Sequence, residues 1–348
     1  MLLLTSAALA ESASEADDAQ AREALRRAQN VRWTQQVLDT HFQGSRFQLE
    51  TTDHFVIVHD TDARRARLRA RLLEQTHERF YDAFDSFASL NSPTKPLVCV
   101  LFADRNDFSR YAQQVDWLDM SWSGGYYSSR TNRMALYDAQ PRQAQERTAP
   151  ADAHDHDTTE RKQPRSNEPA SASDDHTASD SVNRASASPP LNLASTTHEA
   201  AHQLAFNSGL QQRRVMYPFW LSEGLACAFE TNHADESFGL GQLNPTRLSD
   251  LRAAMQNGGL VPLNEFVTMT RPPTGDPQRL NAVYAQAWAL FRFLYLHDRD
   301  KLATYLRRLA HTPHGSRPAG ALRREFVETF GPIRALEKRW QVHLKTLR

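Results

Sequence analysis

Two histidines and a glutamate in one short segment are the residues of this sequence best suited to metal chemistry. His198, Glu199 and His202 form the pattern His-Glu-x-x-His within "LASTTHEAAHQLAFNSGL", residues 193–210. On a helix, residues four apart lie on one face, so both imidazoles can point at one ion. Glu199 lies about 100° around the helix, beside that ion and not bound to it. This pattern predicts a zinc ion held by two histidines, with a carboxylate that acts as a general base.

A third ligand is expected in the next segment, "MYPFWLSEGLACAFE", residues 216–230. A catalytic zinc has three protein ligands and keeps a fourth position for water. Glu223, 21 residues after His202, is expected in the first turns of a second helix, where it is the favoured ligand. Glu230, seven residues after Glu223 on the same helix face, is the alternative third ligand. If it does not bind the metal, it supports a ligand or lies on the surface. We expect Gly224 to let this second helix approach the first one closely.

The two segments together resemble those of the gluzincin zinc metallopeptidases. "HEAAH" and "WLSEGLA" are most similar to the thermolysin-like zinc aminopeptidase group and to bacterial peptidase-like domains of unknown function. The resemblance extends over residues 50–300 and implies zinc bound by His198, His202 and Glu223. It also implies a mixed sheet whose edge strand lies along the substrate cleft. The implied activity is hydrolysis of peptide bonds by a zinc-bound water that Glu199 activates.

The same resemblance implies a catalytic role for Tyr284, which lies 61 residues after Glu223 and opens an apolar helix. The zinc aminopeptidases have a tyrosine at a similar interval that donates to the oxyanion. The alternative is a core tyrosine whose hydroxyl is bonded locally.

The sequence departs from the zinc aminopeptidases in one respect. Those enzymes carry Gly-x-Met-Glu-Asn, whose glutamate binds the free amine of the substrate. The corresponding "SGGYYSSRTNRMALYD" has no glutamate, so aminopeptidase specificity is not expected.

Residues 46–139 are expected to form the α/β part of the domain. "FQLETTDHFVIVHD" predicts two short strands or one bent strand, residues 63–90 a long amphipathic helix, and "KPLVCVLFAD" a buried strand. A short helix at 105–115 and a hairpin with its turn at 130–132 follow. The second strand of that hairpin, "RMALYD", is the candidate edge strand, where an extended peptide could pair.

Residues 191–348 are expected to form the helical, zinc-binding part of the domain. The apolar spacing predicts helices at residues 194–208, 218–232, 245–257, 262–269, 281–296, 299–311 and 319–346. Ser195 or Thr196 can cap the first of them, and Gly209 can end it. The predicted fold class is therefore α+β and zincin-like, with a small mixed sheet and helices in the N-terminal part and a mostly helical C-terminal part.

Three other segments have distinct compositions. Residues 140–190 are rich in Ser, Ala, Asp, Pro and Arg, which predicts a disordered insertion that splits the peptidase domain. Residues 11–45 have the spaced apolar positions of a helix. Residues 1–10 are apolar and end in the small-x-small site Ala8-Leu9-Ala10, but they lack a basic region. They resemble a truncated signal peptide, which indicates an extracytoplasmic protein, either periplasmic or secreted.

The overall composition excludes some partners. The 348 residues carry a formal net charge of zero, so no global field attracts nucleic acid or an acidic membrane. No apolar run reaches the roughly 18 residues that a membrane span needs. The two cysteines, Cys99 and Cys227, lie in apolar runs and are expected to be buried thiols, although a disulfide between them is an alternative.

We therefore expect a zinc metallopeptidase that acts on a peptide or protein. An inactive zinc-binding homologue that serves as an interaction module, and a zinc hydrolase with another kind of substrate, are the alternatives.

Overall fold

The computed structural model describes residues 29, 31–42, 46–85, 89–93, 96–120, 123–138, 192–273 and 275–347. The expected signal peptide and the insertion at 140–190 lie outside these residues. Of the expected helical segment at 11–45, the structure describes a helix over residues 31–41.

Among the described residues of the N-terminal part, five strands form one mixed sheet. They are β1 (Gln48–Thr51), β2 (Phe55–His59), β3 (Leu97–Phe102), β4 (Gly125–Ser128) and β5 (Arg133–Tyr137). Their order is β1-β2-β3-β5-β4, with β2, β3 and β5 parallel and the two outer strands antiparallel. Short turns join the antiparallel pairs, whereas longer crossovers join the parallel ones. The α+β prediction is confirmed, and "FQLETTDHFVIVHD" forms two strands rather than one bent strand.

The predicted edge strand is wrong. "RMALYD" forms β5, which lies between β3 and β4, so the strand at this edge of the sheet is β4. The residues of β5 explain the inner position, because Met134 and Ala135 are fully buried and point to opposite faces of the sheet. A strand that is apolar on both faces is suited to a place inside a sheet with both faces covered.

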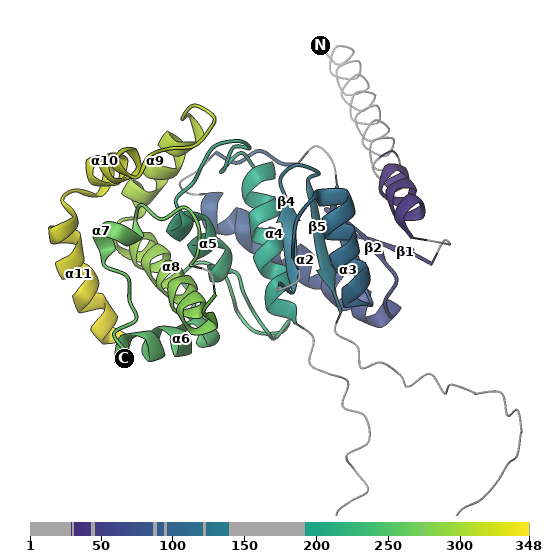
Figure 1. Ribbon diagram of the computed structural model, residues 1–348, viewed down its shortest axis with the longest axis horizontal. Coiled ribbons are helices and arrows are strands. Elements are labelled where there is room, and N and C mark those ends of the chain that lie inside the picture. Colours follow the sequence, from purple (N-terminus) through teal and green to yellow (C-terminus); the bar gives the residue numbers. More distant parts are fainter. Residues whose placement is uncertain are drawn as a thin grey trace, which may run out of the picture. The chain divides into compact units, whose positions relative to one another are not determined.

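Helices cover the two faces of the sheet (Figure 1). Ile57, Cys99 and Leu101 pack in one core with α2 (Ala63–Asp85) and α4 (Leu193–Asn207). The alternate residues of the same strands pack in a second core with α3 (Arg105–Tyr111) and the helix at 31–41. A short π-helix at Ala112–Asp116 follows α3. The sheet is thus the middle layer, and α4, which carries both predicted zinc histidines, packs directly on it.

The C-terminal part is helical, as predicted. Its helices are α5 (Phe219–Ala228), α6 (Pro245–Gln256), α7 (Leu263–Phe266), α8 (Pro277–His297), α9 (Arg299–Ala310), α10 (Ala319–Phe330) and α11 (Ile333–Thr346). The single helix predicted at 319–346 is wrong, because the chain breaks between α10 and α11. Gly331 has a φ of +91°, and Pro332 cannot continue a helix from the preceding turn.

Gly224 allows a close helix contact, but with a different partner from the one expected. A Cβ atom at Gly224 would lie 2.4 Å from the carbonyl oxygen of Ala287 and 2.8 Å from Cβ of Phe291. Both residues belong to α8, so the glycine lets α5 pack tightly against α8 rather than against α4.

Cys99 in β3 and Cys227 in α5 are both buried, free thiols. The expectation of two buried thiols is confirmed, and the disulfide alternative is wrong. Among the described helices, none is both long enough and apolar enough to cross a membrane.

Candidate metal centre

Helix α4 presents the His-Glu-x-x-His motif in regular helical geometry. It begins at Leu193, and its cap is Asn192, whose side chain accepts a 3.2 Å hydrogen bond from the main-chain N–H of Ser195. The prediction of Ser195 or Thr196 as the cap is therefore wrong. The helix ends at Asn207, and Gly209 follows with a φ of +82°, the left-handed conformation that favours glycine at this position.

The two histidines of α4 converge on one carboxylate oxygen of α5. Oε2 of Glu223 lies 3.3 Å from Nε2 of His198 and 3.5 Å from Nε2 of His202. Ligand atoms bound to one tetrahedral zinc at its usual bond lengths lie about 3.3–3.5 Å apart. The three residues form a candidate metal-binding site, with donor atoms spaced as a single small cation requires.

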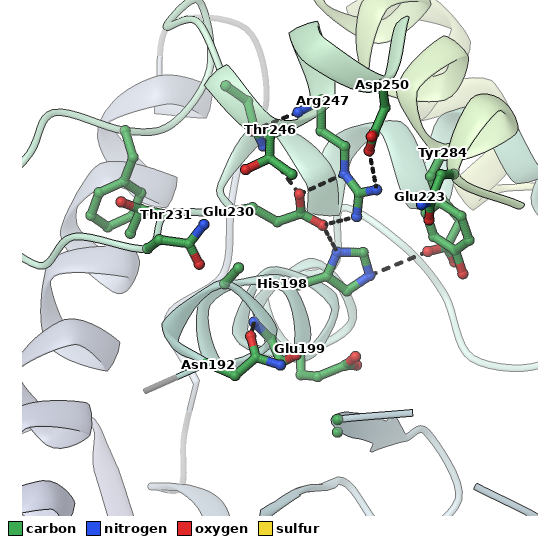
Figure 2. Close-up of a pocket in the computed structure, with 18 of the residues that line it drawn as sticks. Asn192, His198, Glu199, Glu223, Glu230, Thr231, Thr246, Arg247, Asp250 and Tyr284 are labelled. Carbon is green, nitrogen blue, oxygen red and sulfur yellow. Dashed lines mark hydrogen bonds and ion pairs between the residues drawn. The ribbon is translucent and has the colours of Figure 1, made fainter. Parts of the chain in front are cut away.

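Glu230 lies on the other side of the His198 ring. Its Oε1 is 2.9 Å from Nδ1 of His198, and Arg247 donates to both of its oxygens, from Nε at 2.7 Å and Nη2 at 2.6 Å (Figure 2). Asn244 adds a fourth hydrogen bond, 3.1 Å long. The sequence left Glu230 open as a rival ligand, and the structure places it against the ring nitrogen that faces away from Glu223.

Local charges favour a cation beside His198. Burial alone would lower the pKa of His198, but hydrogen bonds with Cys227, Glu223 and Glu230 raise it well above its ordinary value. For Glu230, burial is outweighed by the charge of Arg247, which lowers the pKa to about 2. The buried carboxylates therefore remain ionised and stabilise positive charge, whether it comes from a proton or a metal ion.

A second group of potential ligands shares His198, and sequence reasoning missed one of its members. Cys227 lies with Glu230 close to the His198 ring. The signal that could have found it is its spacing of four residues from Glu223 on α5. Burial raises the pKa of the Cys227 thiol to about 11, and Arg247 already occupies both oxygens of Glu230. A protonated thiol and an engaged carboxylate make this group the poorer metal site.

Glu199 faces the sheet rather than Glu223. The main-chain N–H of Tyr127 in β4 interacts with its carboxylate and favours the ionised form. Burial raises the pKa of Glu199, although the two neighbouring histidines oppose that rise. A Cβ atom at Gly125 would lie 2.4 Å from Cδ2 of Leu136 on β5 and at an ordinary contact distance of 3.5 Å from Cγ of Glu199, so β4 passes directly beside this side chain.

Tyr284 lies on the opposite wall. It is in the second turn of α8, which begins four residues before the predicted start. Its ring is centred 6.3 Å from the ring of His198 and packs edge-on against Phe219 at 5.2 Å. Burial raises the pKa of the phenol far above its ordinary value, so the hydroxyl stays protonated and can donate.

These side chains line one cleft of about 950 Å³. Its walls are formed by β4, the N-terminal half of α4, residues 230–250 and the start of α8. The structure thus brings all five predicted site residues, from three helices, to a single cavity with the edge strand on one side.

The comparison with protein families concerns the helical half of this site. Residues 192–314 match a family described as a protein of unknown function, DUF1570. The matched segment contains all three candidate ligands, Glu199 and Tyr284, whereas β4 and the rest of the sheet lie before it. No curated protein matches the chain.

Proposed function

We propose that this protein is a zinc-dependent peptidase in which His198, His202 and Glu223 hold the metal. The observation that carries the proposal is the convergence of both Nε2 atoms on one oxygen of Glu223, at 3.3 and 3.5 Å. Two imidazoles and one carboxylate are a known ligand set of catalytic zinc in peptidases.

The surroundings of His198 support zinc rather than a bare ion pair. With its Nδ1–H donated to Glu230, His198 keeps the lone pair of Nε2 for a metal, which is the usual way that a carboxylate orients a ligating histidine. Zinc bound there would acidify a water and polarise the carbonyl of the substrate.

Two side chains of the cleft would do the proton chemistry. Glu199 is the general base, and its raised pKa brings it closer to the range in which a carboxylate exchanges protons near neutral pH. Tyr284, from the opposite wall, donates its hydroxyl to the oxygen that gains negative charge as the peptide bond is attacked. The locally bonded alternative has less support, because the Tyr284 hydroxyl makes no hydrogen bond with any of the residues that the structure describes.

The edge strand gives the proposal its substrate class. One side of β4 pairs with β5, and no other strand within the described residues pairs with its second side. Because β4 also lines the cleft, an extended peptide can pair with that second side. Gly124 and Gly125 bring this strand close to the start of α4, since a Cβ atom at Gly124 would lie 2.7 Å from Nδ2 of Asn192. β4 also carries no glutamate to bind a free amine, which leaves the interior of a peptide chain as a possible substrate.

Metal analysis and digestion of a mixed peptide pool test this function. The protein should contain one zinc, and cleavage should stop with a chelator and return with added zinc. Glu199→Gln should keep the zinc and lose cleavage by about a hundredfold or more, because an amide cannot accept the proton. A zinc-loaded wild-type protein that cleaves no peptide would instead favour the inactive interaction module.

A further inference from the structure

The metal-binding helix has a second polar face, directed at the β4–β5 hairpin. Glu199, Gln203 and Asn207 recur at intervals of four residues, and Phe206 lies three residues after Gln203, so they share that face. Gln203 donates to the main-chain oxygen of Asn132 in the hairpin turn at 3.2 Å. The histidines occupy the adjacent face, and the two faces therefore have separate partners.

Arg213, which follows α4, joins this face to the hairpin. Its Nη2 atom lies 2.8 Å from Oδ1 of Asn132, 3.2 Å from the hydroxyl of Tyr127 and 3.3 Å from Oδ1 of Asn207. The two asparagine side chains also bond each other reciprocally, at 2.9 and 2.8 Å. Asn132 has a φ of +55°, so the network holds a turn residue in the left-handed conformation.

Tyr127 connects this network to the candidate base. Its hydroxyl donates to Asn132 at 2.9 Å, and its ring stacks on Phe206 with centroids 5.7 Å apart. Its main-chain N–H favours the ionised form of the Glu199 carboxylate, and β4 passes close to that side chain, since a Cβ atom at Gly125 would lie 3.5 Å from Cγ of Glu199. The side chain is thus fixed at the C-terminal end of α4, while the backbone contacts the residue next to the metal ligands.

We propose that Arg213 is a positioning residue, which holds Tyr127 and thereby sets the place of β4 and of the Glu199 carboxylate. This inference rests on the proposed function. Arg213 does not line the cleft, so it acts only through Tyr127 and the hairpin turn.

The physical basis is a charged donor shared among three neutral acceptors. Hydrogen bonds from a guanidinium are stronger than those between neutral groups, and their loss leaves partly buried oxygens without that donor. All three contacts come from one nitrogen, so a lysine ammonium placed there can replace most of them, whereas a shorter glutamine cannot.

Arg213→Gln, Arg213→Lys and the matched control Arg214→Gln test this role in the full-length, zinc-loaded protein. The control removes a neighbouring arginine that is exposed. We expect Arg213→Gln to lower kcat about tenfold to a hundredfold with KM little changed, as misplacement of a reacting group does. Hydrogen exchange should become faster in the peptide covering β4, and zinc content should stay the same. Arg213→Lys should restore most of kcat, and Arg214→Gln should match the wild type.

Two results would overturn the inference. Unchanged kcat in Arg213→Gln would do so even if exchange in β4 became faster, because the residue would then only stabilise the hairpin. A loss of kcat in Arg214→Gln as large as that in Arg213→Gln would show that removal of any positive charge in this region has the same effect. If Arg213→Gln does not fold, Tyr127→Phe removes one hydroxyl of the network and should change kcat and exchange in the same direction, by less.

A wild-type protein without peptidase activity would overturn the proposed function. In that case, exchange still decides whether Arg213 holds β4: faster exchange in Arg213→Gln supports the contact, and unchanged exchange contradicts it.

Discussion

His198 and Glu230 are joined by a 2.9 Å contact between Nδ1 and Oε1, on the side of the imidazole that faces away from Glu223. Because Arg247 and Asn244 bond the same carboxylate, Glu230 is fixed from three directions. The His198 ring is therefore oriented by contacts with other side chains, and its Nε2 atom faces the candidate metal site.

Removal of the Glu230 charge should weaken metal binding without removing a ligand. Glu230→Gln keeps the size of the side chain and one acceptor oxygen for Nδ1, but it loses the negative charge that pairs with Arg247 and strengthens the bond to His198. We expect a tenfold to hundredfold lower zinc affinity, the range found when the partner of a ligating histidine is lost. Competition with a chromophoric chelator measures it. Glu236→Gln, which changes an exposed carboxylate on the same cleft, should leave the affinity unchanged.

Two single substitutions decide between the two possible metal groups. Glu223→Ala should purify with little zinc, because two histidines alone hold the ion poorly. Cys227→Ala should keep one zinc per chain. Elemental analysis of both variants is sufficient. Full zinc in Glu223→Ala together with loss in Cys227→Ala would move the metal to His198, Cys227 and Glu230.

Tyr284→Phe should affect the reaction and not the fold. It deletes one hydroxyl and keeps the ring that packs on Phe219. Loss of one oxyanion donor typically costs about 2.7–4 kcal/mol, so kcat and kcat/KM should fall together by about a hundredfold to a thousandfold. Zinc content and Tm should remain near those of the wild type. Tyr305→Phe is the control, since Tyr305 is buried in α9 away from the cleft. Normal turnover in Tyr284→Phe would make Tyr284 a packing residue.

His343 should make the protein less stable in mild acid. Burial, together with the charges of His297 and Arg292, lowers the pKa of His343 to about 4. In the unfolded chain the pKa is about 6.5, so below that pH the unfolded state binds the proton more readily. The free energy of unfolding should therefore fall as the pH drops from about 6.5 towards 4.

Urea unfolding at a series of pH values measures this effect. His343→Gln should show a shallower fall than the wild type over that range, and the exposed His314→Gln should show the same fall as the wild type. Parallel curves for all three proteins would mean that His343 does not contribute. Burial and the charge of His54 also lower the pKa of His77 to about 4. His77 should therefore maintain part of the pH dependence of stability in every variant.

The parts of this molecule that depend on local spacing could be predicted from the sequence. His198 and His202 share a helix face whatever lies around them, and the helices of the C-terminal part follow from apolar periodicity. The position of β5 could not be predicted, because strand order is decided by pairing with β3, whose residues lie 35 positions earlier in the chain, as in the pair of Val98 and Arg133. Gly224 indicated a close contact between helices, but the sequence did not show that the contact would be with Ala287 on α8. Tyr127 and Arg213 belong to no recognisable motif, and they lie 86 residues apart in the sequence, so their contact follows only from the fold.

The cleft is encoded by two stretches of chain that lie far apart in the sequence. One wall, β4, ends at Ser128, whereas the donor atoms for the metal all come after Asn192. Substitutions in the strand can reshape what the cleft accepts without altering any metal ligand, and changes on the helices can tune the metal without touching the strand. The selectivity and the metal chemistry proposed for this cleft can therefore diversify independently during evolution, and the place where β4 passes Glu199 is where the two remain linked.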